Sequence, residues 1–141
     1  MAAQVHAESV EGNDVWLVWR VTLPDGTTLI QSSLDGTATE MTVSIIHESS
    51  LGNSKKVIQI FQGVASGTGN EDYIVHTSLQ TDLWGGLDDI GYTVEVRIPA
   101  VGTGYILEGG NKYAVEVALI TLDWGTVLVA ATLQVEALHS V

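Results

Sequence analysis

The chain has 141 residues, which is enough for one domain with a substantial core and too few for two domains of ordinary size. Its 17 acidic and 5 basic residues give a formal net charge of −12, so we expect neither nucleic acid nor an anionic membrane as a partner. The chain contains no cysteine, which excludes disulfides and thiolate metal sites.

The N-terminal residues 1–12 alternate only weakly between polar and apolar types, and we expect a loose arm or an edge strand there. Residues 13–141 are expected to form a single β-sandwich domain. The chain does not open with a basic segment and an apolar run, so we expect no signal peptide. The apolar tract over 113–138 is interrupted by charged residues and predicts two strands in place of a transmembrane helix.

Apolar residues that recur at every second position predict a series of strands separated by turns. The clearest alternation places Val15, Leu17, Trp19, Val21 and Leu23 on one face. No segment of helical length has a 3.6-residue period, so we expect an all-β, antiparallel β-sandwich of about eight strands. The expected strands lie at 15–23, 28–33, 41–45, 57–61, 73–79, 92–98, 113–121 and 127–137.

A leucine, a glycine-rich turn, a tyrosine and an alternating strand follow one another between Leu107 and Val117. The spacing from Leu107 to Tyr113 resembles the tyrosine corner of fibronectin type III and other immunoglobulin-like domains. In those domains the tyrosine hydroxyl donates a hydrogen bond to upstream backbone where the chain passes between sheets. The resemblance implies an immunoglobulin-like sandwich and carries no information on activity.

A second resemblance concerns the segment Gly12-Asn13-Asp14-Val15-Trp16, the turn Pro24-Asp25-Gly26-Thr27 and the terminal hairpin over 113–135. Together they resemble small β-sandwich proteins of tailed bacteriophage particles, such as immunoglobulin-like head decoration proteins and N-terminal domains of baseplate upper proteins. This resemblance implies a structural protein of the virion, assembled in the host cytoplasm.

No catalytic motif stands out. The segment His47-Glu48-Ser49-Ser50 contains suitable atoms, but neighbours on a strand point to opposite faces. The glycine-rich loop over 63–69 lacks the lysine and the following helix of a phosphate-binding loop. We therefore expect neither enzymatic activity nor a cofactor. Two loops could supply oxygen ligands for calcium, although neither has the residue spacing of a calcium-binding loop. Their candidate ligands are Asn70, Glu71 and Asp72 in one loop, and Asp82, Asp88 and Asp89 in the other.

Apolar residues also occupy the second face of several strands, where a free sandwich is polar. If the strands are neighbours, these residues form an exposed patch that marks an association surface. An extra loop or the N-terminal arm is the alternative cover for them. The expected contact residues are Trp16, Val18, Ile120, Leu122 and Leu128, followed by the loop residues Trp84 and Trp124.

These patterns favour a non-enzymatic structural protein that oligomerises through an apolar sheet face. The resemblance to phage proteins implies a virion structural protein, a head decoration (cement) protein that stabilises the capsid by binding across neighbouring subunits. We expect a homo-oligomer, and the usual local symmetry of such lattices suggests a trimer. A baseplate or tail adaptor protein is the alternative within the same class. A carbohydrate-binding module that uses Trp84, Trp124 and loop carboxylates is the alternative from another class, and packing under a loop is the structural alternative for these tryptophans.

Overall fold

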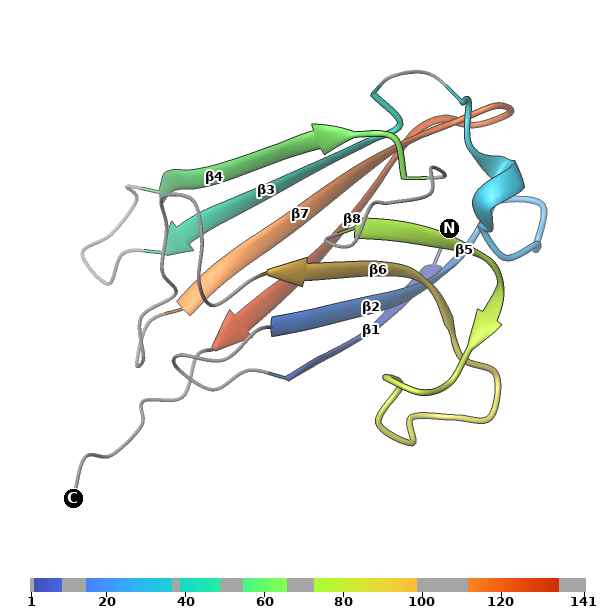
Figure 1. Cartoon of the computed structure of the whole chain (residues 1–141), viewed down its shortest axis with the longest axis horizontal. Helices are drawn as coiled ribbons and strands as arrows, with labels where there is room; N and C mark the ends of the chain where they lie inside the picture. The colour runs from blue at the N-terminus through green and yellow to red at the C-terminus, as the bar shows by residue number, and fades with distance from the viewer. Residues whose placement is uncertain are drawn as a thin grey trace.

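The computed structural model describes residues 2–8, 15–36, 39–48, 55–65, 73–98 and 112–134. These residues form eight β-strands and one short 3-10 helix (Figure 1). The elements in chain order are β1 (Ala2–Glu8), β2 (Val15–Thr22), η1 (Gln31–Ser33), β3 (Met41–Glu48), β4 (Lys55–Gly63), β5 (Tyr73–Gln80), β6 (Tyr92–Ile98), β7 (Lys112–Thr121) and β8 (Gly125–Gln134).

The strands form two sheets of four, and every neighbouring pair is antiparallel. The first sheet has the order β1-β2-β6-β5, and the second sheet has the order β4-β3-β7-β8. With the strands lettered along the chain and β4 as C′, the sheets read A-B-E-D and C′-C-F-G. This is the strand order of an immunoglobulin-like sandwich. The predicted antiparallel, immunoglobulin-like β-sandwich is confirmed.

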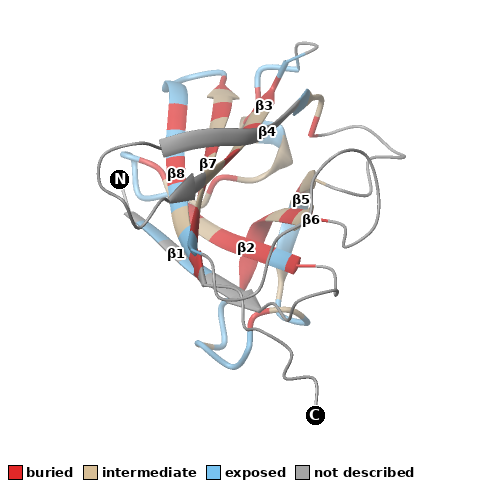
Figure 2. Cartoon of the chain, turned by 90° about the vertical axis from the view of Figure 1, so that its left-hand side faces the viewer, coloured by how far each residue is buried: buried red, intermediate tan, exposed pale blue. Residues whose placement is uncertain are grey.

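The main core lies between the two sheets, where the inward residues of both meet (Figure 2). The predicted face of β2 is buried from Val15 to Leu23. The inward residues of β7 and β8 alternate with half-buried or exposed residues, as a strand with one covered face requires. Tyr113 is buried near the start of β7, which is where the tyrosine corner predicts it. Leu107, its predicted partner, lies outside the described residues.

One expected strand needs correction, and one of the two alternatives for the N-terminus is confirmed. Residues 28–33 are not a strand: the chain makes a single bridge at Thr28 and then enters η1. From η1 the chain crosses to the second sheet, where Leu34 bridges to Thr121. The crossing explains the difference, because a segment that leaves one sheet for the other cannot remain paired in a hairpin. At the N-terminus, residues 2–8 form the edge strand β1 beside β2.

Candidate interaction surface

The outward side of the β7–β8 pair presents mostly small and apolar side chains. Glu116 is the charged residue among them, and it lies opposite Ala130 on β8. Leu128 lies opposite Ala118, and its side chain is 57% exposed. We call this surface the β7–β8 face. It consists of Ala114, Glu116, Ala118 and Ile120 from β7 and Thr126, Leu128, Ala130 and Thr132 from β8.

The turn that joins β7 to β8, residues 122–124, exposes two large apolar side chains. Leu122 is 61% exposed and Trp124 is 43% exposed. The backbone beneath them is fixed, because the Thr121 hydroxyl donates to the carbonyl of Gly125 at 2.8 Å and accepts from the backbone N–H of Trp124 at 3.0 Å. The backbone N–H of Leu122 also donates to the carbonyl of Ser33 at 3.0 Å. We call this turn the hairpin tip. It holds two apolar anchors on an ordered backbone.

Four of the predicted contact residues therefore lie on one hairpin and point away from the core. Ile120 is half-buried on the β7–β8 face, Leu128 is on the same face, and Leu122 and Trp124 are at the hairpin tip. The remaining three lie elsewhere. The expected single patch is wrong because β2 and β7 belong to different sheets, a pairing that local sequence does not reveal.

Trp16 lies on the outer side of β2, opposite Arg97 on β6. The Arg97 guanidinium sits over the Trp16 ring, with its central carbon 5.8 Å from the ring centroid. A cation over an aromatic face stabilises both groups and covers part of the ring. Trp16 is thus partly shielded by its own sheet and is separated from the β7–β8 hairpin.

The expected exposure of Val18 and Trp84 is wrong. Both side chains are only 1% exposed, because the loop over residues 81–91 folds back across the outer side of the first sheet. Tyr92 joins them in a second, smaller core, with its ring centroid 5.9 Å from that of Trp84. The structural alternative, packing under a loop, is therefore correct for Trp84. Tyr92 therefore belongs to this second core and not to the main core.

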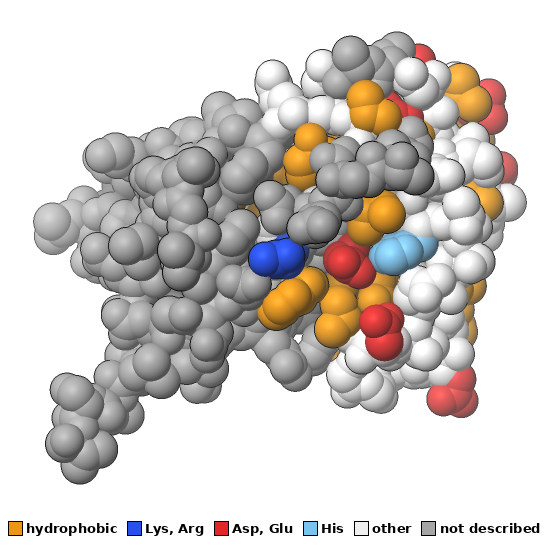
Figure 3. Space-filling view, in the orientation of Figure 1, with side chains coloured by type: hydrophobic (Ala, Val, Ile, Leu, Met, Phe, Trp, Pro, Cys, Tyr) orange, Lys and Arg blue, Asp and Glu red, His pale blue; other side chains and the backbone are white. Residues whose placement is uncertain are grey.

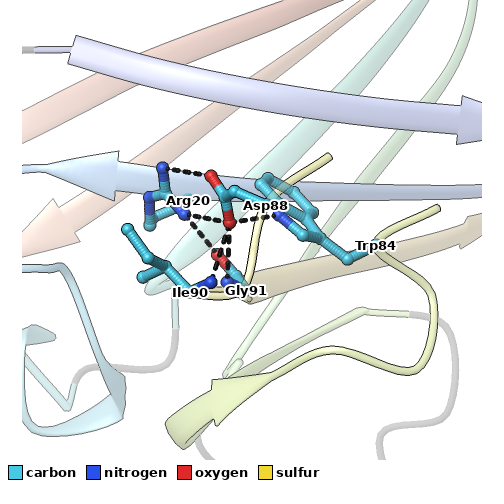
Figure 4. A network of polar contacts seen from close by, with 5 residues as sticks. All are labelled: Arg20, Trp84, Asp88, Ile90 and Gly91. Atoms are coloured by element: carbon cyan, nitrogen blue, oxygen red, sulfur yellow. Dashed lines mark hydrogen bonds and ion pairs between the residues drawn. The ribbon is translucent and has the colours of Figure 1, made fainter. Parts of the chain in front are cut away.

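An ion pair ties this loop to the sheet (Figure 4). Arg20 on β2 reaches both oxygens of Asp88, at 2.9 Å and 2.8 Å. Asp88 Oδ1 also accepts hydrogen bonds from the Trp84 indole at 2.8 Å and from the backbone N–H groups of Ile90 and Gly91 at 2.9 and 3.2 Å. The Arg20 guanidinium, helped by these donors, holds the pKa of Asp88 well below its usual range. Sequence reasoning did not identify this contact.

A chain of polar contacts runs beside the second core. The Tyr92 hydroxyl donates to Asp82 Oδ1 at 2.5 Å, and Glu95 lies 3.1 Å from His76 Nε2. Burial, together with the hydrogen bond to Asp82, raises the pKa of Tyr92 far above its usual value. Figure 3 shows a histidine beside acidic and apolar side chains on this face. Across the described residues, no three histidine, cysteine or carboxylate side chains gather closely enough to hold a metal ion.

The remaining candidates lie outside what the structure describes. The loop with Asn70, Glu71 and Asp72 is not described, and neither is most of the glycine-rich loop over 63–69. His47 and Glu48 end β3, but their side-chain environments are not described. Within the described ranges, no helix is both long and apolar enough to cross a membrane.

Comparison with known proteins adds little to this picture. No protein-family model matches the chain, and no curated protein sequence matches it. A solved structure of murine CRIg aligns with 99% of this chain and 100% of its own, at 12% identity and a TM-score of 0.45. A similarity of this size carries no functional argument. The immunoglobulin-like assignment rests on the strand order, and the function has to be argued from the surface.

Proposed function

We propose that this chain is a non-enzymatic structural protein that assembles with other protein subunits through the β7–β8 hairpin. The observation that carries the proposal is the exposure of Leu122, Trp124 and Leu128 on one hairpin whose backbone is already ordered. Large apolar side chains grouped in this way on a folded domain are typical of an association surface. Tryptophan is also enriched among the residues that dominate binding energy.

The free energy that these side chains can contribute on burial is consistent with this role. Full burial of a leucine side chain contributes about 1.5–3 kcal/mol, so two leucines and a tryptophan contribute several times the thermal energy. Association costs reduce this gain. The hairpin tip limits one such cost, because its backbone is fixed by Thr121 before a partner arrives. The β7–β8 face adds a flat apolar surface with Glu116 as its charged residue.

The specific form of the proposal is a head decoration protein of a virion that binds across neighbouring capsid subunits and forms a homo-oligomer. It is supported by the resemblance of segments 12–16 and 24–27 to small phage β-sandwich proteins. A protein that bridges subunits needs apolar contacts outside its own core, and the β7–β8 hairpin offers them. A baseplate or tail adaptor uses the same kind of surface and is the alternative within this class.

Carbohydrate binding is the second candidate. Trp84 cannot contribute to a sugar site, because an indole that is buried under a loop cannot stack on a sugar ring. Trp124 remains, with Asp123 beside it in the hairpin tip. This arrangement supplies one aromatic platform and one carboxylate, which is a weaker basis than the apolar hairpin.

The test is co-sedimentation with purified capsids encoded by the same genome, in parallel with a glycan array. Leu122→Ser and Trp124→Ser are expected to lose capsid binding, while the wild-type protein binds capsids and no glycan. Leu87→Ser is a matched control, because Leu87 is 51% exposed on the loop over 81–91. Equal capsid binding by all four proteins contradicts the proposal. Binding of wild type to glycans alone favours the carbohydrate module.

A further inference from the structure

The open edge of β8 differs from the other three sheet edges. β8 runs from Gly125 to Gln134 without a charge, a proline or a register shift against β7. Edge strands are normally protected by charges, prolines, bulges or short length, because unpaired backbone groups template pairing with another chain. β4 begins with two lysines, β1 is shorter and ends at Glu8, and the register of β5 against β6 shifts between Val75 and Gln80.

The backbone groups of β8 that face this edge can be identified from β7. Ile120 donates its N–H to Glu40 and accepts from the N–H of Asp35, so both its polar groups point away from β8. Backbone direction alternates along a strand. The odd-numbered residues of β7 and β8 therefore pair with each other, and the even-numbered residues of β8 face the open edge. A contact from the other sheet confirms the direction of Ala130. The Trp19 indole, on β2, donates to the Ala130 carbonyl at 3.4 Å.

The edge residues are consequently Thr126, Leu128, Ala130 and Thr132. Among the described residues, the Trp19 indole is the one partner found for any of their backbone groups. A carbonyl has two acceptor positions, so Ala130 retains one for a second donor. β1 approaches β8 but pairs with β2, so within the described ranges this edge of β8 has no strand paired with it.

The sequence from Thr126 to Thr132 has a threonine at each end and only apolar residues between them, with Val129 at its centre. We infer that β8 pairs antiparallel with β8 of a second copy of this chain, across a two-fold axis at Val129. This register places Thr126 opposite Thr132 of the second copy, and Leu128 opposite Ala130. Paired threonines and a large residue against a small one are favourable cross-strand neighbours. The inference concerns the edge of β8, so it stands or fails independently of the partner proposed for the hairpin tip.

The distribution of charge makes this edge suitable for a second copy. A chain with a net charge of −12 repels its own copies, and the repulsion is weakest where the contact itself contains no acidic group. β8 is uncharged along its whole length. Glu116 lies one strand away from the edge, so the two copies of Glu116 are separated by about 14 Å, or three strand spacings. At physiological salt this exceeds the screening length of about 8 Å.

The pairing joins the two second sheets into one continuous sheet. A two-fold axis makes a dimer, where the usual symmetry of capsid lattices suggested a trimer. The two hairpin tips then lie at opposite ends of the β8 pair, about 40 Å apart, since each tip is about six residues from the axis at 3.3 Å per residue. A dimer of this form presents two apolar anchors to two neighbouring subunits.

The first test is sedimentation equilibrium of the full chain and of Ala130→Pro. The Ala130 N–H faces the open edge, so proline removes a donor that β7 does not use. We expect wild type and the control Ala130→Ser to be dimers, and Ala130→Pro to dissociate about 100-fold more readily. A monomeric wild type, or a dimer that Ala130→Pro leaves intact, overturns the inference. Retained capsid binding by a monomeric Ala130→Pro separates this inference from the proposed function.

Disulfide trapping keeps the test decisive if Ala130→Pro does not fold. The chain has no cysteine, so single substitutions give clean cross-links. In the proposed register, Leu128→Cys mixed with Ala130→Cys forms a mixed disulfide on oxidation, because directly opposite residues are about 5.5 Å apart at Cα. Either variant alone is expected to cross-link at least 10-fold more slowly. Absence of the mixed disulfide, or faster cross-linking within either variant alone, overturns the pairing.

Discussion

Arg20 and Asp88 join a sheet strand to a loop 68 residues away through an ion pair that engages both carboxylate oxygens. Asp88 Oδ1 also accepts hydrogen bonds from the Trp84 indole and from two backbone N–H groups of the loop. One carboxylate therefore fixes both the loop backbone and the aromatic ring beneath it. This relationship converts an apolar outer surface of the first sheet into a second core. It also explains why Val18 and Trp84 are not available to a partner.

Removal of this ion pair is expected to loosen the loop and expose Trp84. Asp88→Asn removes the charge and keeps the shape, so the indole fluorescence should shift to longer wavelength while far-ultraviolet circular dichroism stays unchanged. Asp89→Asn is the matched control, because Asp89 is exposed on the same loop. An unchanged emission spectrum for Asp88→Asn contradicts the role given to the ion pair.

The Arg20–Asp88 ion pair predicts that the loop over 81–91 loses stability only at strongly acidic pH. The pKa of Asp88 lies well below its ordinary value of 3.8, so the ion pair contributes stability throughout the range above that value. The contribution is lost only as the pH falls below 3.8 toward the lowered pKa of the folded state. Trp84 emission followed from pH 7 downward should stay constant to about pH 4 in wild type. A shift of the emission between pH 7 and 5 contradicts this assignment.

Gly91 is expected to be intolerant of any side chain. Its φ is +102°, and a Cβ atom there would lie 2.2 Å from the backbone oxygen of Gln80. Gly91→Ala should therefore lower the free energy of unfolding by more than about 2 kcal/mol. Gly86→Ala isolates the backbone cost, since Gly86 has φ of +75° and open space around it. Urea denaturation measures both, and equal losses contradict the steric argument.

Substitutions of Trp84 and Trp124 are expected to affect different properties: Trp84 contributes to stability and Trp124 to binding. Trp84→Ala leaves a cavity in the second core and should cost about 3–5 kcal/mol of unfolding free energy. Trp124→Ala removes an exposed ring and should change that free energy by less than about 0.5 kcal/mol. Chemical denaturation of both variants is the measurement. A large loss for Trp124→Ala shows that its ring packs against the chain's own fold.

Strand positions and the main core could be predicted because they follow from short-range alternation. The faces through Val15–Leu23 and Tyr113–Leu119 were identified correctly, since a period of two requires no knowledge of neighbours. The order of the strands could not be predicted in the same way, because it depends on pairings between residues far apart. For that reason Trp16 and Ile120 were grouped on one patch although they lie on different sheets.

The second core was missed for a related reason. Alternation assigns Val18 and Arg20 to an outer face, and it gives no indication of which loop returns to cover that face. A signal was present in the loop itself, where Leu83 and Trp84 interrupt a run of glycine and aspartate residues. Apolar side chains in such a loop favour packing against a strand, and the cation of Arg20 requires a carboxylate when it is mostly buried.

Self-association is expected to strengthen as salt is added. The net charge of −12 makes two copies repel each other, while the proposed contact at β8 contains no charge that salt would weaken. Raising NaCl from about 20 to 300 mM should therefore lower the dimer dissociation constant by about an order of magnitude. Sedimentation equilibrium at both concentrations measures this. A dimer that dissociates with salt indicates a contact built on ion pairs.

The central claim on self-association is that β8 of one copy pairs with β8 of a second copy. Amide hydrogen exchange of the dilute and the concentrated protein tests it most directly, because the edge-facing N–H groups of Leu128 and Ala130 have no partner among the described residues. Concentration is predicted to protect these two amides while those of the loop over 81–91 remain unchanged. Protection that appears elsewhere and leaves β8 unchanged would contradict the account.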